Sequence, residues 1–318
     1  MSELITETPL SENTYITENK YTCWVKEKNN EYIPCLTTYP TLEPGKYKIK
    51  WNSSFGNYVF ARESLVLDDL LELPNNTFRE ILSDINYFWD NRQLFTKYKF
   101  SYKRGILLYG NPGCGKSSIV ALLSLQIIKK GGIVLSIQSY DDLNNYNNEF
   151  RKTFKTIQPN TPVLVIFEDL DALIRSSEAE TMLLNVLDGM NQSSNIVNIG
   201  CTNYPENLKE RILNRPSRFD KRYYFGLPDA LNRKFYFENK ILPEDIEKSG
   251  GESFINDLVS KTEGLSLAHL GELIKSIFIF KNTLEDTLSI LRGMEKTISS
   301  SRNDGTKSVG FTNKVLIR

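Results

Sequence analysis

The octapeptide GNPGCGKS, residues 110–117, constrains the fold of this 318-residue chain more than any other feature. It has the spacing G-x-x-x-x-G-K-[ST], and it lies between the apolar run GILLYG and the helix-like segment GKSSIVALLSLQIIKK. A strand, a glycine-rich turn and a helix in this order are typical of a phosphate-binding loop. The sequence therefore predicts an α/β fold whose parallel sheet holds a nucleotide at the carboxyl edge of its strands.

Each residue type in this loop suits phosphate binding. Gly113 and Gly115 let backbone N–H groups curl around phosphate oxygens. Lys116 can reach the β and γ phosphates, and the Ser117 hydroxyl can bind Mg²⁺, so ATP and Mg²⁺ are the expected ligands. The predicted nucleotide-binding residues of the loop are Gly110, Asn111, Pro112, Gly113, Cys114, Gly115, Lys116, Ser117 and Ser118.

The whole chain divides into four predicted regions. Residues 1–65 read as short strands with turns and predict a small β-rich N-terminal domain. In residues 66–227 apolar strands alternate with helical segments, which predicts a parallel sheet sandwiched by helices. Residues 228–300 predict a helical lid domain, and residues 301–318 a polar tail.

Composition narrows the function classes. Lys and Arg together number 39, as do Asp and Glu, and this balance argues weakly against a dedicated nucleic-acid binder. The four cysteines form no C-x-x-C pair and the single histidine, His269, is distant in sequence, so metal-site spacing is absent. We expect free thiols, with a Cys23–Cys35 disulfide left open.

The chain shows neither a signal peptide nor an apolar run of membrane-spanning length. We therefore expect no membrane span and a cytoplasmic protein. The many Asn, Lys, Ile and Tyr residues are typical of an AT-rich genome, such as that of a phage or a virus. For a viral protein, the expected compartment is the cytoplasm of the host.

Two acidic residues, Glu168 and Asp169, end the apolar strand VLVIF. A strand beside a phosphate loop places such carboxylates at the ligand edge of the sheet. One is expected in the Mg²⁺ shell, and the other is expected to orient or deprotonate the attacking water.

The segment 195–229 adds three candidates. Asn203, at the end of an apolar strand, can hydrogen-bond the attacking water or the γ phosphate. Arg215 and Arg218 are either surface charges or groups that stabilise phosphate charge, and the residues by themselves leave both readings open.

These motifs, in this order, resemble the AAA clade of the AAA+ ATPases over residues 66–285. GNPGCGKS resembles the Walker A loop, VIFEDLDAL resembles Walker B, and GCTNYPENLKERILNRPSRFD resembles the second region of homology. The resemblance implies that Asn203 is sensor 1 and that Arg215 and Arg218 are arginine fingers. The segment EGLSLAHLGELI (263–274) resembles the family's lid helix and implies a nucleotide contact at Ala268.

The resemblance also implies a homo-oligomeric ring, usually a hexamer, in which the fingers reach the ATP of the next copy. Within the clade the chain most resembles the mitochondrial Rieske-protein translocase subfamily, on YKRGILLYGNPGCGKSS, FEDLDAL and LLNVLDGM. We find no membrane anchor or targeting region like those of that subfamily. The resemblance is therefore taken to imply the type of ATPase, and not the localisation or the substrate.

Three departures from the family pattern affect the expectations. Walker B usually ends Asp-Glu, whereas here the order is Glu168-Asp169. By position Glu168 is the Mg²⁺ ligand and Asp169 the catalytic base, although the roles could follow residue type instead. In the lid, Leu267 and His269 replace the usual Gly and Asp, and we expect His269 on a helix surface rather than in catalysis.

The third departure is the pore segment 136–154, which is short and lacks the family's glycine pair. Tyr140 and Tyr146 are expected at a helix start and in packing, with a pore-lining role as the alternative.

The function that fits these features best is a ring-forming, chaperone-like AAA ATPase that couples ATP hydrolysis to remodelling, assembly or translocation of a protein partner. The alternative is a nucleic-acid-associated AAA+ motor or loader. It would need a basic channel with aromatic residues, for which only KYKIKW (46–51) and YKFSYKR (98–104) are candidates. A nucleotide-gated scaffold without enzymatic activity is disfavoured by the intact lysine, acids and arginines.

Overall fold

The computed structural model describes residues 23–26, 32–35, 38–53, 56–65, 70–74, 77–188, 195–213, 215 and 217–303. The chain divides into two compact units, Met1–Leu42 and Glu43–Arg318. In the first unit, strands β1 (Cys23–Lys26) and β2 (Tyr32–Cys35) pair antiparallel, with Cys23 opposite Cys35 in the register. The side chains of β1 and β2 lie outside the described part, as do residues 304–318 of the predicted tail. The structure therefore does not test whether Cys23 and Cys35 form a disulfide.

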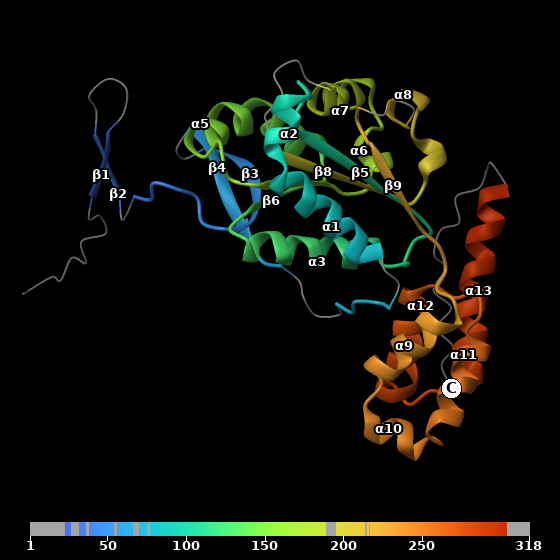
Figure 1. Cartoon of the computed structure of the whole chain (residues 1–318). Coiled ribbons are helices and arrows are strands. Elements are labelled where there is room, and N and C mark those ends of the chain that lie inside the picture. Colours follow the sequence, from blue (N-terminus) through green and yellow to red (C-terminus); the bar gives the residue numbers. More distant parts are fainter. Residues whose placement is uncertain are drawn as a thin grey trace, which may run out of the picture. The chain divides into compact units, whose positions relative to one another are not determined.

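The second unit contains a seven-stranded sheet with the order β4-β3-β6-β7-β8-β5-β9 (Figure 1). Every neighbouring pair is parallel except β3–β4. The sheet confirms the predicted α/β fold class. Its strands are β3 (Gly45–Asn52), β4 (Asn57–Glu63), β5 (Lys103–Gly110), β6 (Ile133–Ile137), β7 (Val163–Phe167), β8 (Ile196–Thr202) and β9 (Lys221–Phe225).

Residues 45–63 correct the predicted domain boundary at residue 65. They form β3 and β4 at one edge of the large sheet, not part of a separate β-rich domain. The start of β3 pairs in parallel with β6, with Lys46 opposite Val134 and Tyr47 opposite Leu135. The alternating pattern of KYKIKW predicts a strand but does not specify its partner.

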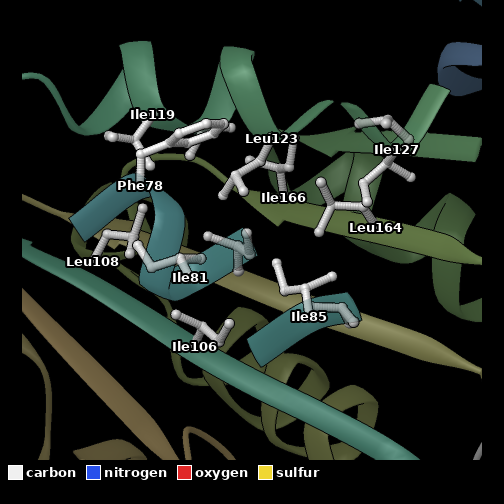
Figure 2. Close-up of a cluster of buried hydrophobic side chains, with 14 of the residues drawn as sticks. Phe78, Ile81, Ile85, Ile106, Leu108, Ile119, Leu123, Ile127, Leu164 and Ile166 are labelled. Atoms are coloured by element: carbon white, nitrogen blue, oxygen red, sulfur yellow. The ribbon is translucent and has the colours of Figure 1, made fainter. Parts of the chain in front are cut away.

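Helices α1 (Thr77–Asp90) and α3 (Lys116–Lys129) cover one face of the sheet. On α1 the buried residues Phe78, Ile81 and Ile85 recur at helical spacing, so they form one apolar stripe. Figure 2 shows this stripe packed between side chains of α3 and alternate residues of the strands. Burial of each such side chain contributes about 1.5–3 kcal/mol. The packed strand and helix side chains shown are Ile106, Leu108, Ile119, Leu123, Ile127, Leu164 and Ile166.

The strand residues that point the other way, such as Leu107 and Val165, are buried too, as expected for a parallel sheet with two covered faces. Tyr146 is buried and stacks on Phe150 with 5.0 Å between ring centroids, which confirms its packing role. Tyr140 is the first residue of α4 and is 43% exposed. The elements of this part are α4 (Tyr140–Asn145), the π-helix η1 (Tyr146–Phe154), α5 (Lys155–Ile157), α6 (Leu170–Leu173) and α7 (Ser177–Asp188).

The helices that follow β9 have an apolar cluster of their own, which includes Phe237, Leu258, Leu270 and Leu273. Leu71 and Leu73, from the segment before α1, pack against this cluster. None of the described helices is both long enough and apolar enough to cross a membrane. The helices are α9 (Ala230–Lys240), α10 (Pro243–Lys248), α11 (Glu252–Lys261), α12 (Leu267–Ile274), η3 (Lys275–Ile279) and α13 (Leu284–Asn303).

Three short elements complete the description. The helix α2 (Arg92–Lys97) follows α1, while η2 (Pro205–Asn207) and α8 (Glu210–Leu213) lie between β8 and β9.

Candidate active site

Three segments that carry predicted site residues meet at one edge of the sheet. In the register, Tyr109 of β5 lies opposite Thr202 of β8, and Phe167 of β7 lies opposite Gly200 of β8. The phosphate-binding loop follows β5, the acids Glu168 and Asp169 follow β7, and Asn203 follows β8. Because these strands are parallel, their carboxyl ends present all three segments on the same side.

The loop is held at its start by β9 and at its end by α3. The Asn111 N–H donates to the Phe225 carbonyl at 3.1 Å. Gly115, with φ of 93°, is the N-cap of α3, a left-handed conformation that favours glycine. The first backbone N–H groups of α3 have no intrahelical acceptor, so they are available to a phosphate.

Lys116 is buried within the loop. Its Nζ donates to the carbonyls of Gly110 and Asn111, each at 2.8 Å. Burial lowers the pKa of Lys116, while the negative charges of Asp169 and Asp171 act in the opposite direction. The ammonium therefore lies against backbone carbonyls of the loop, at the place where a triphosphate would need a counter-charge.

The lid helix α12 docks directly on the loop. The Ala268 N–H donates to the Gly113 carbonyl at 3.0 Å. At the start of α12, Ser266 and His269 form a capping box in which Nδ1 of His269 lies 2.9 Å from the Ser266 Oγ. His269 is therefore a half-buried capping residue, which refines the expectation of a helix surface and fits its exclusion from catalysis.

Substitution of Gly113 by alanine is expected to weaken ATP binding by about tenfold or more. Gly113 has φ of 72°, and an added Cβ would lie 2.8 Å from both the Ala268 Cβ and the Ser266 Oγ. The loop and α12 would have to separate where they now form a hydrogen bond. Titration with a fluorescent ATP analogue measures the effect, and Gly131→Ala, at a similar positive φ with no atom within 4 Å of the added Cβ, is the matched control.

A cavity of about 520 Å³ opens between the loop, α12 and the segment before α1. This volume is within the range of small-molecule sites. One side is apolar, with Leu71, Leu73 and Tyr236, and the other exposes the loop backbone with Lys116 and Ser117. An apolar wall beside a phosphate loop suits a nucleoside base, and Ala268, the predicted nucleotide contact, is among the residues that line this cavity.

A second cavity of about 380 Å³ is also lined by the loop residues Lys116 and Ser117. It is lined by both predicted acids, Glu168 and Asp169, and by Asn203. Asn203 and Ser117 line the first cavity as well, so they mark the junction of the two. The junction is where the end of a triphosphate would meet the acids.

The two acids have different surroundings. Glu168 is fixed in place, because its carboxylate accepts from Gln138 Nε2 at 2.9 Å and from Ser136 Oγ at 3.3 Å. Asp169 is exposed, has φ of 46°, and caps α6 without a side-chain hydrogen bond to the helix. A third acid, Asp171, accepts from the Thr202 hydroxyl at 2.7 Å and so ties the Walker B-like segment to the residue before Asn203.

The donor set fits Mg²⁺, the divalent ion expected with a nucleoside triphosphate. Mg²⁺ prefers hard oxygen ligands and is usually bound by one or two protein groups together with phosphates and waters. The exposed Ser117 hydroxyl and the carboxylates at the second cavity are oxygen donors of this kind. The described residues hold no group of three or more His, Cys, Asp or Glu, so a metal cage made only of protein ligands is not what they form.

Arg215 and Arg218 differ in exposure. The Arg215 side chain is 61% exposed, whereas that of Arg218 is 7% exposed. Both bond to Asp188, the last residue of α7, through Arg215 Nη1 at 2.8 Å and Arg218 Nε at 2.8 Å. Neither arginine is among the residues that line the two described cavities.

Sequence reasoning missed the residues that support the site. Glu180 of α7 is buried and bonds to Lys209 and Arg211, and these bonds hold the pKa of its carboxyl at about 2, with the Arg211 hydrogen bond as the main cause. Gln138, which bonds to Glu168, had a visible signal because it directly follows the apolar run IVLSI at the same edge of the sheet. Glu180 had no such signal, because a glutamate in a helix usually faces solvent.

Comparison with known proteins shows a likeness to ATPases. Residues 106–227 match the family described as "ATPase family associated with various cellular activities (AAA)". A protein described as a cell division cycle ATPase in Plasmodium falciparum (isolate 3D7) is 27% identical over 253 residues, which cover 74% of this chain and 19% of that protein.

Two further relatives extend this likeness. A proteasome-associated ATPase of Parafrankia sp. (strain EAN1pec) is 30% identical over 241 residues, covering 61% of this chain and 40% of the relative. The ATPase family gene 2 protein of Schizosaccharomyces pombe (strain 972 / ATCC 24843) is 27% identical over 248 residues, covering 74% and 27%. The chain thus spans less than half the length of each of these relatives.

Proposed function

We propose that this chain, an ATP hydrolase with an AAA domain over residues 106–227, works as a ring of copies that acts on a protein partner. The observation that supports a ring is the absence of arginine among the described residues that line the two cavities. Phosphoryl-transfer sites commonly need an arginine against the developing charge. The exposed Arg215 of a neighbouring copy can supply it, and six copies is the number that the family resemblance favours.

The side chains of one copy would then divide the work at its own site. Lys116 and the loop backbone bind the phosphates, and Asn203 orients the attacking water. We assign Asp169 as the base, since its carboxylate is exposed and makes no capping bond, and Glu168 to the metal shell, since two hydrogen bonds fix it. Mg²⁺, when bound, neutralises phosphate charge.

The subfamily is also a proposal. The order Glu168-Asp169 and the segment LLNVLDGM support the mitochondrial Rieske-protein translocase subfamily. The described part of that segment ends at Asp188, which bonds to both arginines.

A protein partner is favoured over nucleic acid because four of the six cations in the two basic candidates, 46–51 and 98–104, are already bonded within the chain. Lys48 lies 3.0 Å from Asp142, and Arg104 lies 2.8 Å from Asp84. Lys46 lies 3.6 Å from Glu63, and Lys103 donates to the Leu187 carbonyl. A cation that is paired within the chain releases fewer counterions on binding a phosphate backbone. Proteasome-associated ATPases among the relatives point the same way.

Assays of ATP turnover over a range of protein concentrations test both parts of the proposal. Specific activity is expected to rise with concentration as the oligomer detected by light scattering forms. Addition of an unfolded protein is expected to raise turnover, whereas single-stranded DNA and RNA leave it unchanged. Equal specific activity in a dilute monomer would refute the ring, and salt-sensitive stimulation by nucleic acid would favour the alternative of a nucleic-acid motor.

A further inference from the structure

We propose that Glu180 is a positioning residue that fixes the arginine segment, residues 209–218, in the place from which it serves the neighbouring copy. This inference rests on the proposed ring. Glu180 does not line either cavity, so it is not expected to contact the nucleotide of its own copy. Its contacts lie at the start of the arginine segment.

Both oxygens of the Glu180 carboxylate are bonded across a sequence separation of about 30 residues. Oε1 accepts from Arg211 Nε at 2.5 Å, and Oε2 accepts from Lys209 Nζ at 2.6 Å. The Glu180 side chain is 1% exposed, whereas those of Lys209 and Arg211 are 63% and 49% exposed. The anchor is therefore on α7, and the segment is held from its inner side.

The bonds continue from Arg211 to the arginines. The Arg211 carbonyl accepts from Arg218 Nη1, and Arg218 in turn bonds to Asp188. Arg215 bonds to the same carboxylate. Helix α7 thus holds the arginine segment at two points. Glu180 bonds to the start of the segment, and Asp188 bonds to the end of the segment.

Because the Glu180 carboxylate is buried, its charge depends on the two cations that bond to it. A carboxylate removed from water needs strong partners, and here both its oxygens are paired with cations. Loss of the charge would leave Lys209 and Arg211 free to turn toward solvent, because they are already about half exposed. The segment would keep its fold but lose its fixed position, and a displacement of about 1 Å in a charge-stabilising group can cost about 10²-fold in rate.

Mixtures of two variant subunits test this inference. The acceptor, Arg215→Ala, has an intact site but no exposed finger. The donor, Asp169→Asn, keeps its arginines but cannot use its own ATP. We expect the donor to restore turnover to the acceptor, and the same donor with Glu180→Gln added to restore about a tenth of it or less.

A donor with Arg211→Gln repeats the test from the exposed side of the ion pair, where Lys209 still bonds to the buried Glu180 carboxylate, and is expected to fail in the same way. The matched control adds Glu252→Gln to the donor. Glu252 also bonds to a lysine, Lys234 at 2.8 Å, but on the lid and 74% exposed, so rescue should be unchanged.

The outcomes distinguish the proposed ring from the proposed positioning role of Glu180. If the simple donor restores turnover and the Glu180→Gln and Arg211→Gln donors restore it equally well, Glu180 has no positioning role while the ring stands. If the simple donor itself fails, the trans arrangement is wrong and the role of Glu180 is overturned with it. Nucleotide affinity of homogeneous Glu180→Gln is expected to stay within about twofold of the unaltered chain, because a positioning defect acts on the rate.

Discussion

Replacement of Arg215 by alanine is expected to lower kcat for ATP hydrolysis by about 10³-fold or more while ATP affinity stays nearly constant. The described cavities beside the phosphate loop are lined by lysine but no arginine, and in the proposed ring each site takes its arginine from the neighbouring copy. Arg215 is the exposed member of its pair, and its bond to Asp188 leaves the guanidinium at the surface. Such a group stabilises charge that develops in the transition state and contributes little to ground-state binding.

Steady-state kinetics and equilibrium nucleotide binding, measured on the same preparation, give the two numbers separately. Arg62→Ala is the matched control, because Arg62 is 60% exposed and lies 3.0 Å from Glu43, much as Arg215 lies 2.8 Å from Asp188. We expect the control to retain full turnover. An Arg215→Ala chain that assembles and turns over at the normal rate would show that Arg215 is a surface charge.

The local parts of the site could be predicted from the sequence, because short segments determine them. The loop needs only a strand, glycines and a helix in order, and its lysine and serine follow at fixed spacing. The acids and Asn203 were predicted at the same edge because parallel strands end together. The registers of β5, β7 and β8 agree with that expectation.

The parts that could not be predicted depend on distant partners. Nothing in KYKIKW states that its strand pairs with β6, more than 80 residues later in the chain. Glu180 is buried, and its charge is paired by Lys209 and Arg211, which lie about 30 residues later in the chain. Arg215 and Arg218 have the same chemistry and are three residues apart, yet the fold buries one and exposes the other.

The second prediction with a large effect concerns the order Glu168-Asp169. Single substitutions can show which of the two acids is the catalytic base and which is the Mg²⁺ ligand. Asp169→Asn is expected to lower kcat by about 10²- to 10⁴-fold with ATP and Mg²⁺ binding retained, because an amide cannot accept the proton of the attacking water. Glu168→Gln is expected to raise the Mg²⁺ concentration needed for half-maximal turnover, because a metal ligand loses its charge. Turnover measured as a function of Mg²⁺ concentration distinguishes a defect that excess metal corrects from one that it does not.

The structure offers a physical reason for this assignment. Glu168 is held by Ser136 and Gln138, and a carboxylate with fixed oxygens is suited to a metal shell that demands regular geometry. Asp169 is shorter than the usual glutamate, and its left-handed backbone at φ of 46° changes the direction in which the side chain leaves the strand. If excess Mg²⁺ instead rescues Asp169→Asn and leaves Glu168→Gln inactive, the roles follow residue type and not position. The bonds from Ser136 and Gln138 would then hold the base away from its water until the nucleotide binds.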